Sequence, residues 1–314
     1  MGKLYMLVGL PGAGKSSYAK ILSENLSDHK IKHKIFSSDE YRLEMKKEKG
    51  VVPDNNQVFT KLYRDLRAFM ETGGSAIFDA TNITYKVRRK AFSALQGIEY
   101  ESVAIVLCSR VEKCIERNLQ RDEEARVPIQ VIYDMMLRFE LPQIYEGFKD
   151  IVIKHSTEPT QHPQKGTLLL EMLGFDQRTK YHKYSLGKHC DMVALNYPKG
   201  SPLYYAGLWH DVGKMYTQSI DDNGYAHYYS HENVSAYYIL THPWLIDYDP
   251  DYPAKLRDII FYINHHMHIR EIIKSDKAIN KYRELWGEEK FQNLIDFMNN
   301  DNAASGRIIN EDLD

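Results

Sequence analysis

The octapeptide Gly9–Ser16, Gly-Leu-Pro-Gly-Ala-Gly-Lys-Ser, constrains the fold of this chain more than any other feature. It fits the pattern G-x-x-x-x-G-K-[S/T], follows the strand-like segment Leu4–Val8 and precedes the helix-like segment Tyr18–Leu26. Glycines in such a loop let backbone N–H groups turn toward phosphate oxygens at the positive end of a helix. The octapeptide therefore predicts a phosphate-binding loop, and the alternative is a glycine-rich turn without a ligand.

The loop also predicts how ATP and Mg²⁺ bind. The Lys15 ammonium is expected to reach the outer phosphates, and the Ser16 hydroxyl is expected to ligate Mg²⁺. Such a loop identifies the phosphate donor, so the acceptor has to be inferred from other residues. The residues predicted to hold ATP from this loop are Gly9, Gly12, Ala13, Gly14, Lys15, Ser16 and Ser17.

The 314 residues are enough for two domains with separate cores. Residues 1–154 alternate apolar runs with helix-like stretches, which predicts an α/β domain with a parallel sheet and helices on both faces. Residues 155–166 are polar and predict a linker, and residues 167–314 show helical spacing and predict an all-α domain. The expected strands are Leu4–Val8, Ile35–Ser37, Ala76–Phe78, Ser102–Leu107 and Ile151–Ile153, and the expected helical segments are Leu168–Leu173, Leu203–Trp209, Ala236–Leu240, Ile259–Ile263 and Phe291–Met298.

Composition limits the environment and the partners. No segment approaches the roughly 18 consecutive apolar residues of a membrane span, and the N-terminus has no signal-peptide pattern, so we expect a cytoplasmic protein without membrane contact. The three cysteines lack CxxC spacing and are expected to be reduced thiols. A net charge of −2 predicts that any nucleic-acid contact comes from a local basic surface, which suits strand ends better than a wrapped duplex.

Two side chains after the second expected strand suggest an acceptor site. Asp39 and Arg42 are three residues apart, which on a starting helix separates a carboxylate and a guanidinium by one turn. At the carboxyl end of a parallel strand, the first can accept a hydroxyl proton and the second can hold a phosphate. The alternative is an N-cap aspartate next to a surface arginine.

Three arginines further along predict a lid over ATP. Arg117 and Arg121 are four residues apart and would share one face of a helix, with Arg126 in the loop beyond. Together they could spread the charge that develops on the transferred phosphoryl group. The alternative is a solvated basic helix.

Histidine and aspartate residues dominate the chemistry of the second domain. His210-Asp211 is followed by Val-Gly and Lys214, so that an imidazole and a carboxylate could share one divalent ion while the lysine meets a phosphate. Imidazole ligands suit Mn²⁺, Ni²⁺, Co²⁺ or Zn²⁺ better than Mg²⁺ alone, and such ions activate water for attack on phosphorus. The alternative is a set of core histidines without metal. The remaining candidate ligands are His189, His231, His265, His266 and Asp301.

The first half resembles the kinase domain of bacteriophage-type 5′-hydroxyl polynucleotide kinases over residues 1–154. The resemblance implies that Asp39 is the general base on the 5′-hydroxyl, that Arg42 anchors a substrate phosphate, and that Arg117 and Arg121 grip ATP. Related kinases of small molecules or tRNA share the loop and lid, so the polynucleotide acceptor depends on the Asp-Glu-Tyr-Arg box. The motifs that carry the resemblance are Gly9–Ser16, Asp39-Glu40-Tyr41-Arg42, Asp79-Ala80-Thr81-Asn82 and Arg117-Asn118-x-x-Arg121 with Val127-Pro128-Ile129.

The second half resembles the HD phosphohydrolase superfamily over residues 167–314, whose motif order is H…HD…H…H…D. The resemblance implies a first metal site made by His189, His210, Asp211 and Asp301. It also implies that His231, with either His265 or His266, completes a second site or binds phosphate, and spacing does not choose between the two adjacent histidines. In bacterial fusions of these two modules the HD module comes first, whereas here it comes second.

Joined in one chain, the two resemblances imply an enzyme that heals broken nucleic-acid strands. The expected activities are a 5′-hydroxyl polynucleotide kinase and a 2′,3′-cyclic phosphodiesterase and 2′(3′)-phosphatase, acting on RNA or DNA ends before an RNA ligase. The main rival is a nucleoside or small-metabolite kinase joined to a nucleotide phosphohydrolase. A third interpretation is a nucleotide-binding regulatory switch with a degenerate HD module.

Overall fold

The computed structural model describes residues 1–51, 53–156, 164–179, 183–247 and 252–306. The chain divides into two compact units. The first comprises residues 1–135 and 142–157, and the second comprises residues 136–141 and 158–314. Residues 157–163 of the predicted linker lie outside the described part of the chain.

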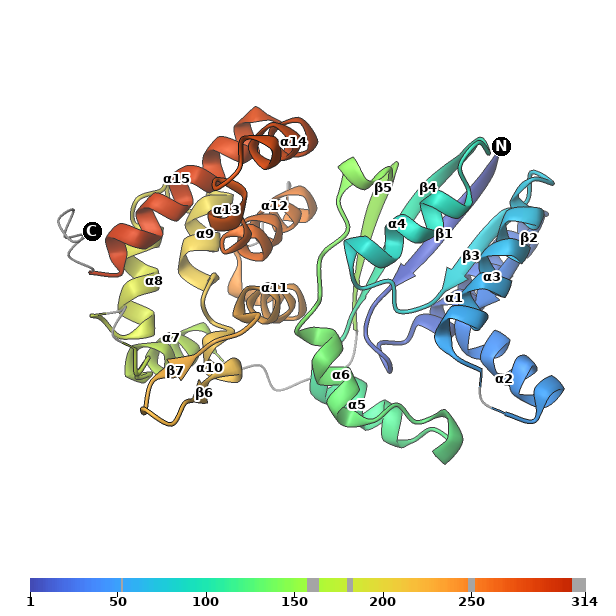
Figure 1. Cartoon of the computed structure of the whole chain (residues 1–314), viewed down its shortest axis with the longest axis horizontal. Coiled ribbons are helices and arrows are strands. Elements are labelled where there is room, and N and C mark those ends of the chain that lie inside the picture. The colour runs from blue at the N-terminus through green and yellow to red at the C-terminus, as the bar shows by residue number, and fades with distance from the viewer. Residues whose placement is uncertain (52, 157–163, 180–182, 248–251, 307–314) are drawn as a thin grey trace. The chain divides into compact units, whose positions relative to one another are not determined.

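The first unit is built on a parallel sheet of five strands in the order β2-β3-β1-β4-β5 (Figure 1). All five expected strands are present, each longer than its apolar core suggested, and the predicted parallel α/β architecture is confirmed. Their inward side chains, among them Leu4, Met6, Phe36 and Phe78, are fully buried. The strands are β1 (Gly2–Val8), β2 (His33–Ser37), β3 (Ser75–Asp79), β4 (Tyr100–Cys108) and β5 (Asp150–His155).

Helices follow each of the first four strands, so the candidate residues of this unit gather at one edge of the sheet. The phosphate-binding loop follows β1, the Asp39 box follows β2 and Asp79 ends β3. In open parallel sheets, ligands bind at the carboxyl ends of the strands beside the place where the strand order reverses. The helices are α1 (Lys15–Asp28), α2 (Ser38–Lys49), α3 (Asn55–Met70), α4 (Tyr85–Ala94), α5 (Val111–Leu119) and α6 (Ile129–Met136), with short 3₁₀ turns η1 (Glu123–Ala125) and η2 (Ile144–Glu146).

The second unit is mainly helical, and all five expected helical segments lie within observed helices. Its core contains the fully buried rings of Trp209, Phe261 and Phe297. Among the described residues, no helix is both long and apolar enough to cross a membrane. The helices are α7 (Lys165–Gly174), α8 (Leu186–Ala194), α9 (Pro202–Trp209), α10 (Lys214–Thr217), α11 (His231–Thr241), η3 (Pro243–Leu245), α12 (Tyr252–His265), α13 (His268–Ile272), α14 (Asp276–Trp286) and α15 (Glu288–Ala304).

The second unit also contains a small hairpin, so the prediction of an all-α domain is wrong in this detail. Strands β6 (Ser219–Ile220) and β7 (Ala226–His227) pair antiparallel. The Asp221 carboxylate accepts hydrogen bonds from the backbone N–H groups of Asn223 and Tyr225, and Gly224 adopts a φ of 81°. These side-chain and glycine preferences favour a tight turn over a helix.

The predicted boundaries of the domains also need a correction, because residues 136–141 belong to the second unit. The Phe139 ring is fully buried and packs edge-on against Tyr237 on α11, with 5.1 Å between centroids. The Asn264 amide on α12 donates to the Phe139 carbonyl and accepts from the Leu141 N–H. Apolar burial and satisfied backbone groups therefore fix this segment to helices that come more than 90 residues later in the sequence.

Candidate functional site

The phosphate-binding loop is held in shape by close backbone packing. Gly12 adopts a φ of 81°, and a Cβ atom there would lie 2.1 Å from the carbonyl oxygen of Cys114 on α5. Only glycine fits this position. The Lys15 ammonium donates to the carbonyls of Gly9 and Leu10 at 3.0 and 2.9 Å, and burial lowers its pKa. The lysine is therefore held inside the loop that is predicted to receive the outer phosphates.

Ser16, the predicted Mg²⁺ ligand, is paired with Asp79. The Ser16 hydroxyl donates to the Asp79 carboxylate at 2.8 Å across the gap between α1 and β3. Burial raises the pKa of Asp79, while the Ser16 hydrogen bond and the Lys15 charge oppose that rise. A hydroxyl paired with a carboxylate suits a hard cation. Asp79 was absent from the predicted ligands, although an acidic residue directly after a buried strand is the sequence signal that could have found it.

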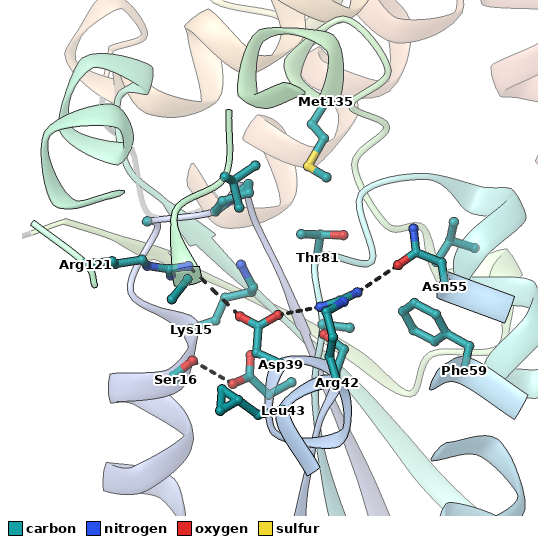
Figure 2. Close-up of a pocket in the computed structure, with 18 of the residues that line it drawn as sticks. Lys15, Ser16, Asp39, Arg42, Leu43, Asn55, Phe59, Thr81, Arg121 and Met135 are labelled. Carbon is teal, nitrogen blue, oxygen red and sulfur yellow. Dashed lines mark hydrogen bonds and ion pairs between the residues drawn. The ribbon is translucent and has the colours of Figure 1, made fainter. Parts of the chain in front are cut away.

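Asp39 lies between two arginines at the mouth of this loop (Figure 2). Its carboxylate is 3.1 Å from the Arg42 guanidinium and 4.0 Å from that of Arg121, and Arg42 also donates to the Asn55 amide oxygen at 2.8 Å. Ser37, and not Asp39, is the N-cap of α2, because its side chain accepts from the Glu40 N–H. The capping alternative for Asp39 is therefore wrong, and its carboxylate faces the two arginine side chains.

The three lid arginines occupy different local structures. Helix α5 ends at Leu119, so Arg121 follows the helix and does not share a helical face with Arg117 as predicted. The chain turns here because the buried Asn118 side chain bonds both the N–H and the carbonyl of Val127. Arg117 donates to the Gly12 carbonyl at 3.2 Å, and Arg126 donates to the Arg121 carbonyl at 2.9 Å.

One cavity of about 1560 Å³ brings the predicted residues of the first unit together. Its walls include side chains from the phosphate-binding loop, the Asp39 box, α3, α4 and the arginine segment. Gly9 and Ala13 do not line the cavity. Their backbone N–H groups instead hold the turn of the loop, since Gly9 donates to the Thr81 carbonyl and Ala13 donates to the Leu10 carbonyl. The predicted residues that line the cavity are Gly12, Gly14, Lys15, Ser16, Ser17, Asp39, Arg42, Arg117, Arg121 and Arg126.

In the second unit, four predicted residues converge into a first buried group. The His189 Nε2 atom on α8 lies 3.3 Å from the Nε2 atom of His210, which follows α9. The Asp301 Oδ1 atom on α15 lies 3.0 and 3.6 Å from these two nitrogens, and the Asp211 Oδ2 atom lies 3.5 and 3.4 Å from them. Residues more than 100 positions apart in sequence thus direct nitrogen and oxygen atoms at one point.

A second group uses the other oxygen of the same aspartate. Asp211 Oδ1 lies 3.0 Å from His231 Nε2 and 3.7 Å from His266 Nε2, and the two nitrogens are 3.3 Å apart. The two oxygens of Asp211 therefore face two different histidine pairs. The potential ligand atoms lie within 4.8 Å of one another in each of two sets: His189, His210 and Asp211, and Asp211, His231 and His266.

The tautomers of the histidines fit metal binding. The Nδ1 atoms of His210, His231 and His266 lie 2.7–2.9 Å from the carbonyls of Gly207, Tyr228 and Ile263. An Nδ1–H that donates to a carbonyl leaves the Nε2 lone pair available as a ligand, which is the common arrangement around metal-bound histidine. All three Nε2 atoms point at the Asp211 carboxylate.

Neighbouring charges shift the pKa values of the side chains in the cluster. Burial alone would lower the pKa of His189, but the carboxylates of Asp211 and Asp301 outweigh it and raise that pKa to about 9. The pKa of Asp211 is well below its usual range, because His210 and Lys214 outweigh the effect of burial. Burial and the neighbouring His210 and His231 hold the pKa of His266 well below its usual range. The negative charges of the two buried carboxylates are therefore balanced by basic groups of the cluster.

Two cations, the buried Lys214 and the half-buried Arg270, pair with the carboxylates of this cluster. The Lys214 ammonium lies 2.7 Å from Asp211 Oδ2 and donates to the Gln177 amide oxygen at 3.2 Å. The Arg270 guanidinium donates to Asp301 Oδ2 and to the Asn302 amide oxygen. The sequence pointed to Lys214, as a phosphate contact, but not to its pairing with Asp211. It did not point to Arg270, since a single arginine on a short helix belongs to no recognisable motif.

His265 is not part of the cluster, so its prediction as a possible metal ligand is corrected. Its ring packs against Phe261 and Trp286, with centroids 4.7 and 4.8 Å away. Burial, with smaller effects from His268 and Lys290, lowers its pKa to about 3. His265 is the last residue of α12, whereas His266 lies just beyond it and turns into the cluster.

Comparison with known proteins finds similar proteins for the first unit. Residues 4–142 match the family model described as an AAA domain. Over 144 residues the chain is 26% identical to L-seryl-tRNA(Sec) kinase of Methanococcus maripaludis, which covers 44% of this chain. The chain spans about half (53%) of the length of this curated relative.

Solved structures of low identity match the same part of the chain. One is a putative kinase from Chloroflexus aurantiacus, with a TM-score of 0.38 and 18% identity, covering 48% of this chain and 86% of its own. Another is a fungal RNA kinase, with a TM-score of 0.35 and 13% identity, covering 53% of this chain and 80% of its own. Kinases are thus among the proteins to which this part of the chain is similar.

Proposed function

We propose that the protein is a bifunctional end-healing enzyme, which phosphorylates a 5′-hydroxyl polynucleotide end with Mg-ATP and removes a 2′,3′-cyclic, 2′ or 3′ phosphate in its second unit. The observation that carries the proposal is the position of Asp39 between Arg42 and Arg121 at the mouth of the phosphate-binding loop. The second activity is supported by the buried histidine and aspartate cluster.

The kinase step follows from the geometry around Asp39. An acceptor hydroxyl next to this carboxylate would lose its proton to Asp39 as its oxygen attacks the γ-phosphorus of ATP. The bond from that phosphorus to the β,γ-bridging oxygen breaks, and ADP leaves. Lys15 and Arg121 are placed on the donor side of Asp39 to balance the phosphoryl charge, and Arg42 is placed on the other side (Figure 2).

A polynucleotide acceptor is favoured over a nucleoside by the Arg42 contact. A guanidinium held by Asp39 and Asn55 has its donors fixed in a fork that matches a phosphate diester. A nucleoside has no phosphate to occupy this position. The curated relative is named as a kinase of an aminoacyl-tRNA, which is an RNA-linked acceptor.

The phosphohydrolase assignment depends on the cluster around Asp211 and on the HD motif order. Metal ions bound there would supply Lewis-acid polarisation of the scissile phosphate and an activated water. His189, His210, Asp301 and one oxygen of Asp211 would hold one ion, and His231 and His266 with the other oxygen would hold the next. Lys214, held between Asp211 and Gln177, would orient the Asp211 carboxylate and bind a phosphate oxygen.

Two paired assays test the proposal. Transfer of labelled phosphate from ATP is measured to a 5′-hydroxyl oligonucleotide and to a panel of nucleosides and small alcohols, and phosphate release is measured from RNA with a 3′-phosphate or a 2′,3′-cyclic phosphate. We expect transfer to the oligonucleotide in Mg²⁺ and phosphate release in Mn²⁺, Ni²⁺, Co²⁺ or Zn²⁺. Transfer confined to nucleosides, with hydrolysis of free nucleotides, would establish the nucleotide-metabolism alternative instead.

The lid predicts a first kinetic effect. Replacing Arg121 by glutamine should lower kcat by on the order of 10²-fold, because its guanidinium faces the Asp39 side of the cavity where charge develops during transfer. Steady-state kinetics with ATP and an oligonucleotide measure this effect. An unchanged kcat with a raised KM for ATP would limit Arg121 to ground-state binding.

The adjacent histidines predict a second effect, on metal binding. Replacing His266 by glutamine should weaken Mn²⁺ binding by at least about tenfold, because its Nε2 atom faces His231 and Asp211. Replacing His265 by phenylalanine should leave Mn²⁺ binding unchanged, because its ring packs among aromatic side chains. Calorimetric titration of the metal-free variants decides between them, and equal losses in both would contradict the assignment of His266.

A further inference from the structure

The cavity of the first unit carries more positive charge than ATP binding uses. Of the described residues that line it, nine are basic and four are acidic, although the whole chain has a net charge of −2. The phosphate-binding loop and the lid account for Lys15, Arg117, Arg121 and Arg126, and Arg42 is paired with Asp39. Lys46 is paired with Glu124 at 2.7 Å. The three basic residues that remain all come from α4: Lys86, Arg89 and Lys90.

Helical geometry presents these three side chains on one face of α4. At 3.6 residues per turn, positions 86, 89, 90 and 93 lie together, and Ser93 also lines the cavity. All three basic side chains are exposed, and within the described part of the chain no carboxylate forms an ion pair with any of them. Like charges three and four residues apart on a helix repel each other, and a bound anion would offset this repulsion.

Arg88 fixes the rotation of α4 that aims this face. On the other side of the helix, its fully buried guanidinium forms two hydrogen bonds to the Glu146 carboxylate at 2.7 and 2.8 Å and one to the Asn82 carbonyl at 3.0 Å. A bidentate pair of this kind is rigid. The orientation of the basic face is therefore built into the fold and does not depend on flexible surface lysines alone.

The basic face lies on the acceptor side of the cavity. Helix α4 packs against α3, whose Asn55 holds Arg42, and α3 also contributes Phe59 to the wall. Figure 2 places Arg42, Asn55 and Phe59 on one side of Asp39, with Arg121 and Lys15 on the other. Helix α4 therefore adjoins the helix that holds Arg42, and its basic face lines the same cavity.

We propose that Lys86, Arg89 and Lys90 form a subsite for backbone phosphates of the acceptor strand, downstream of the phosphate bound by Arg42. This inference rests on the proposed kinase function and extends it, since a single-phosphate acceptor would leave the subsite empty. The enzyme then selects acceptors by strand length. The contacts are to phosphates and carry no base preference, so the subsite supplies affinity and positioning without sequence specificity.

The test measures KM and kcat of the full-length protein for three 5′-hydroxyl acceptors: a nucleoside 3′-phosphate, a trinucleotide and a tetranucleotide, which carry successively more phosphates. In the wild type, KM should fall with each added phosphate. In the variant Lys86→Gln/Arg89→Gln/Lys90→Gln, KM for the tetranucleotide should rise roughly tenfold or more. The slope of log KM against log salt should fall by about 1.4, because two of its phosphates lose their contacts. The KM for the nucleoside 3′-phosphate, and kcat for all three acceptors, should stay within about twofold.

Two further variants separate a subsite from a general charge effect. The variant Lys20→Gln/Lys34→Gln/Lys149→Gln makes the same charge change at exposed positions that do not line the cavity, and should behave as the wild type. The variant Lys86→Arg/Lys90→Arg should retain the length dependence.

Fluorescence anisotropy of a labelled 5′-hydroxyl tetranucleotide, without ATP, separates the subsite from the kinase assignment. Loss of tetranucleotide binding only in the α4 glutamine variant supports the subsite even if transfer goes to another acceptor. Equal length dependence in that variant and the wild type, with transfer intact, overturns the subsite and leaves the kinase in place.

Discussion

Replacing Asp211 by asparagine is expected to lower phosphate release from an RNA 3′-phosphate by about 10³-fold or more, while transfer to a 5′-hydroxyl end stays nearly unchanged. Both oxygens of Asp211 face histidine pairs, so the substitution would remove the carboxylate that is proposed to contribute to both metal sites, together with its negative charge. Metal polarisation of phosphate is worth several kcal/mol, and each 1.4 kcal/mol is about tenfold in rate.

Metal analysis and a matched variant accompany this measurement. Asp211→Asn should lose bound Mn²⁺ in the same preparation in which it loses phosphate release. Asp191→Asn, an exposed carboxylate on the helix that carries His189, should lose neither. Metal-stripped wild type should keep kinase activity in Mg²⁺ and recover phosphate release with Mn²⁺, Ni²⁺ or Co²⁺. Phosphate release that persists in Asp211→Asn would remove the second half of the end-healing proposal.

Replacing Asp39 by asparagine should lower kcat for transfer to a 5′-hydroxyl oligonucleotide by about 10²- to 10⁴-fold, the usual range for a lost general base. The amide keeps the shape of the side chain and can still accept from Arg42, so the loss would report on the proton and not on the packing. Lys15→Ala should abolish transfer as well, because its ammonium is the buried charge of the phosphate-binding loop.

The control for this prediction is Asp122→Asn, which changes an exposed carboxylate on the wall of the same cavity. Its kcat should equal that of the wild type. Hydrolysis of an RNA 3′-phosphate should be nearly intact in Asp39→Asn and Lys15→Ala, since both residues lie in the first unit. Equal loss of both activities in a folded Asp39 variant would be incompatible with two separate sites.

Contiguous motifs could be predicted from the sequence because all their functional residues lie within a few positions of one another. The loop Gly9–Ser16 and the pair His210-Asp211 need only a strand or a helix next to them to be placed. The five strands were predicted for a similar reason, since buried parallel strands are short apolar runs between helices. Their ends extended beyond the predictions because polar residues continue the hydrogen-bonded ladder.

Features that depend on tertiary contacts could not be predicted in this way. The choice of His266 over His265 is decided by where α12 ends and by the aromatic pocket around Trp286. Arg270 meets Asp301 only because two helices pack together, and Asp79 meets Ser16 only across neighbouring strands. The basic face of α4 was hidden in sequence because Arg88, buried on the opposite side, looks like one more surface arginine.

Because residues 136–141 belong to the helical unit, the chain cannot be divided cleanly at the predicted linker. A fragment that stops at residue 154 would carry Phe139 and Leu141 away from the core that buries them, and a fragment that starts at residue 158 would lack them. Each half would expose an apolar gap or an apolar segment, which costs stability and invites aggregation. The two units are thus interleaved along the chain. Division of the chain at the apparent linker would therefore not yield two intact units.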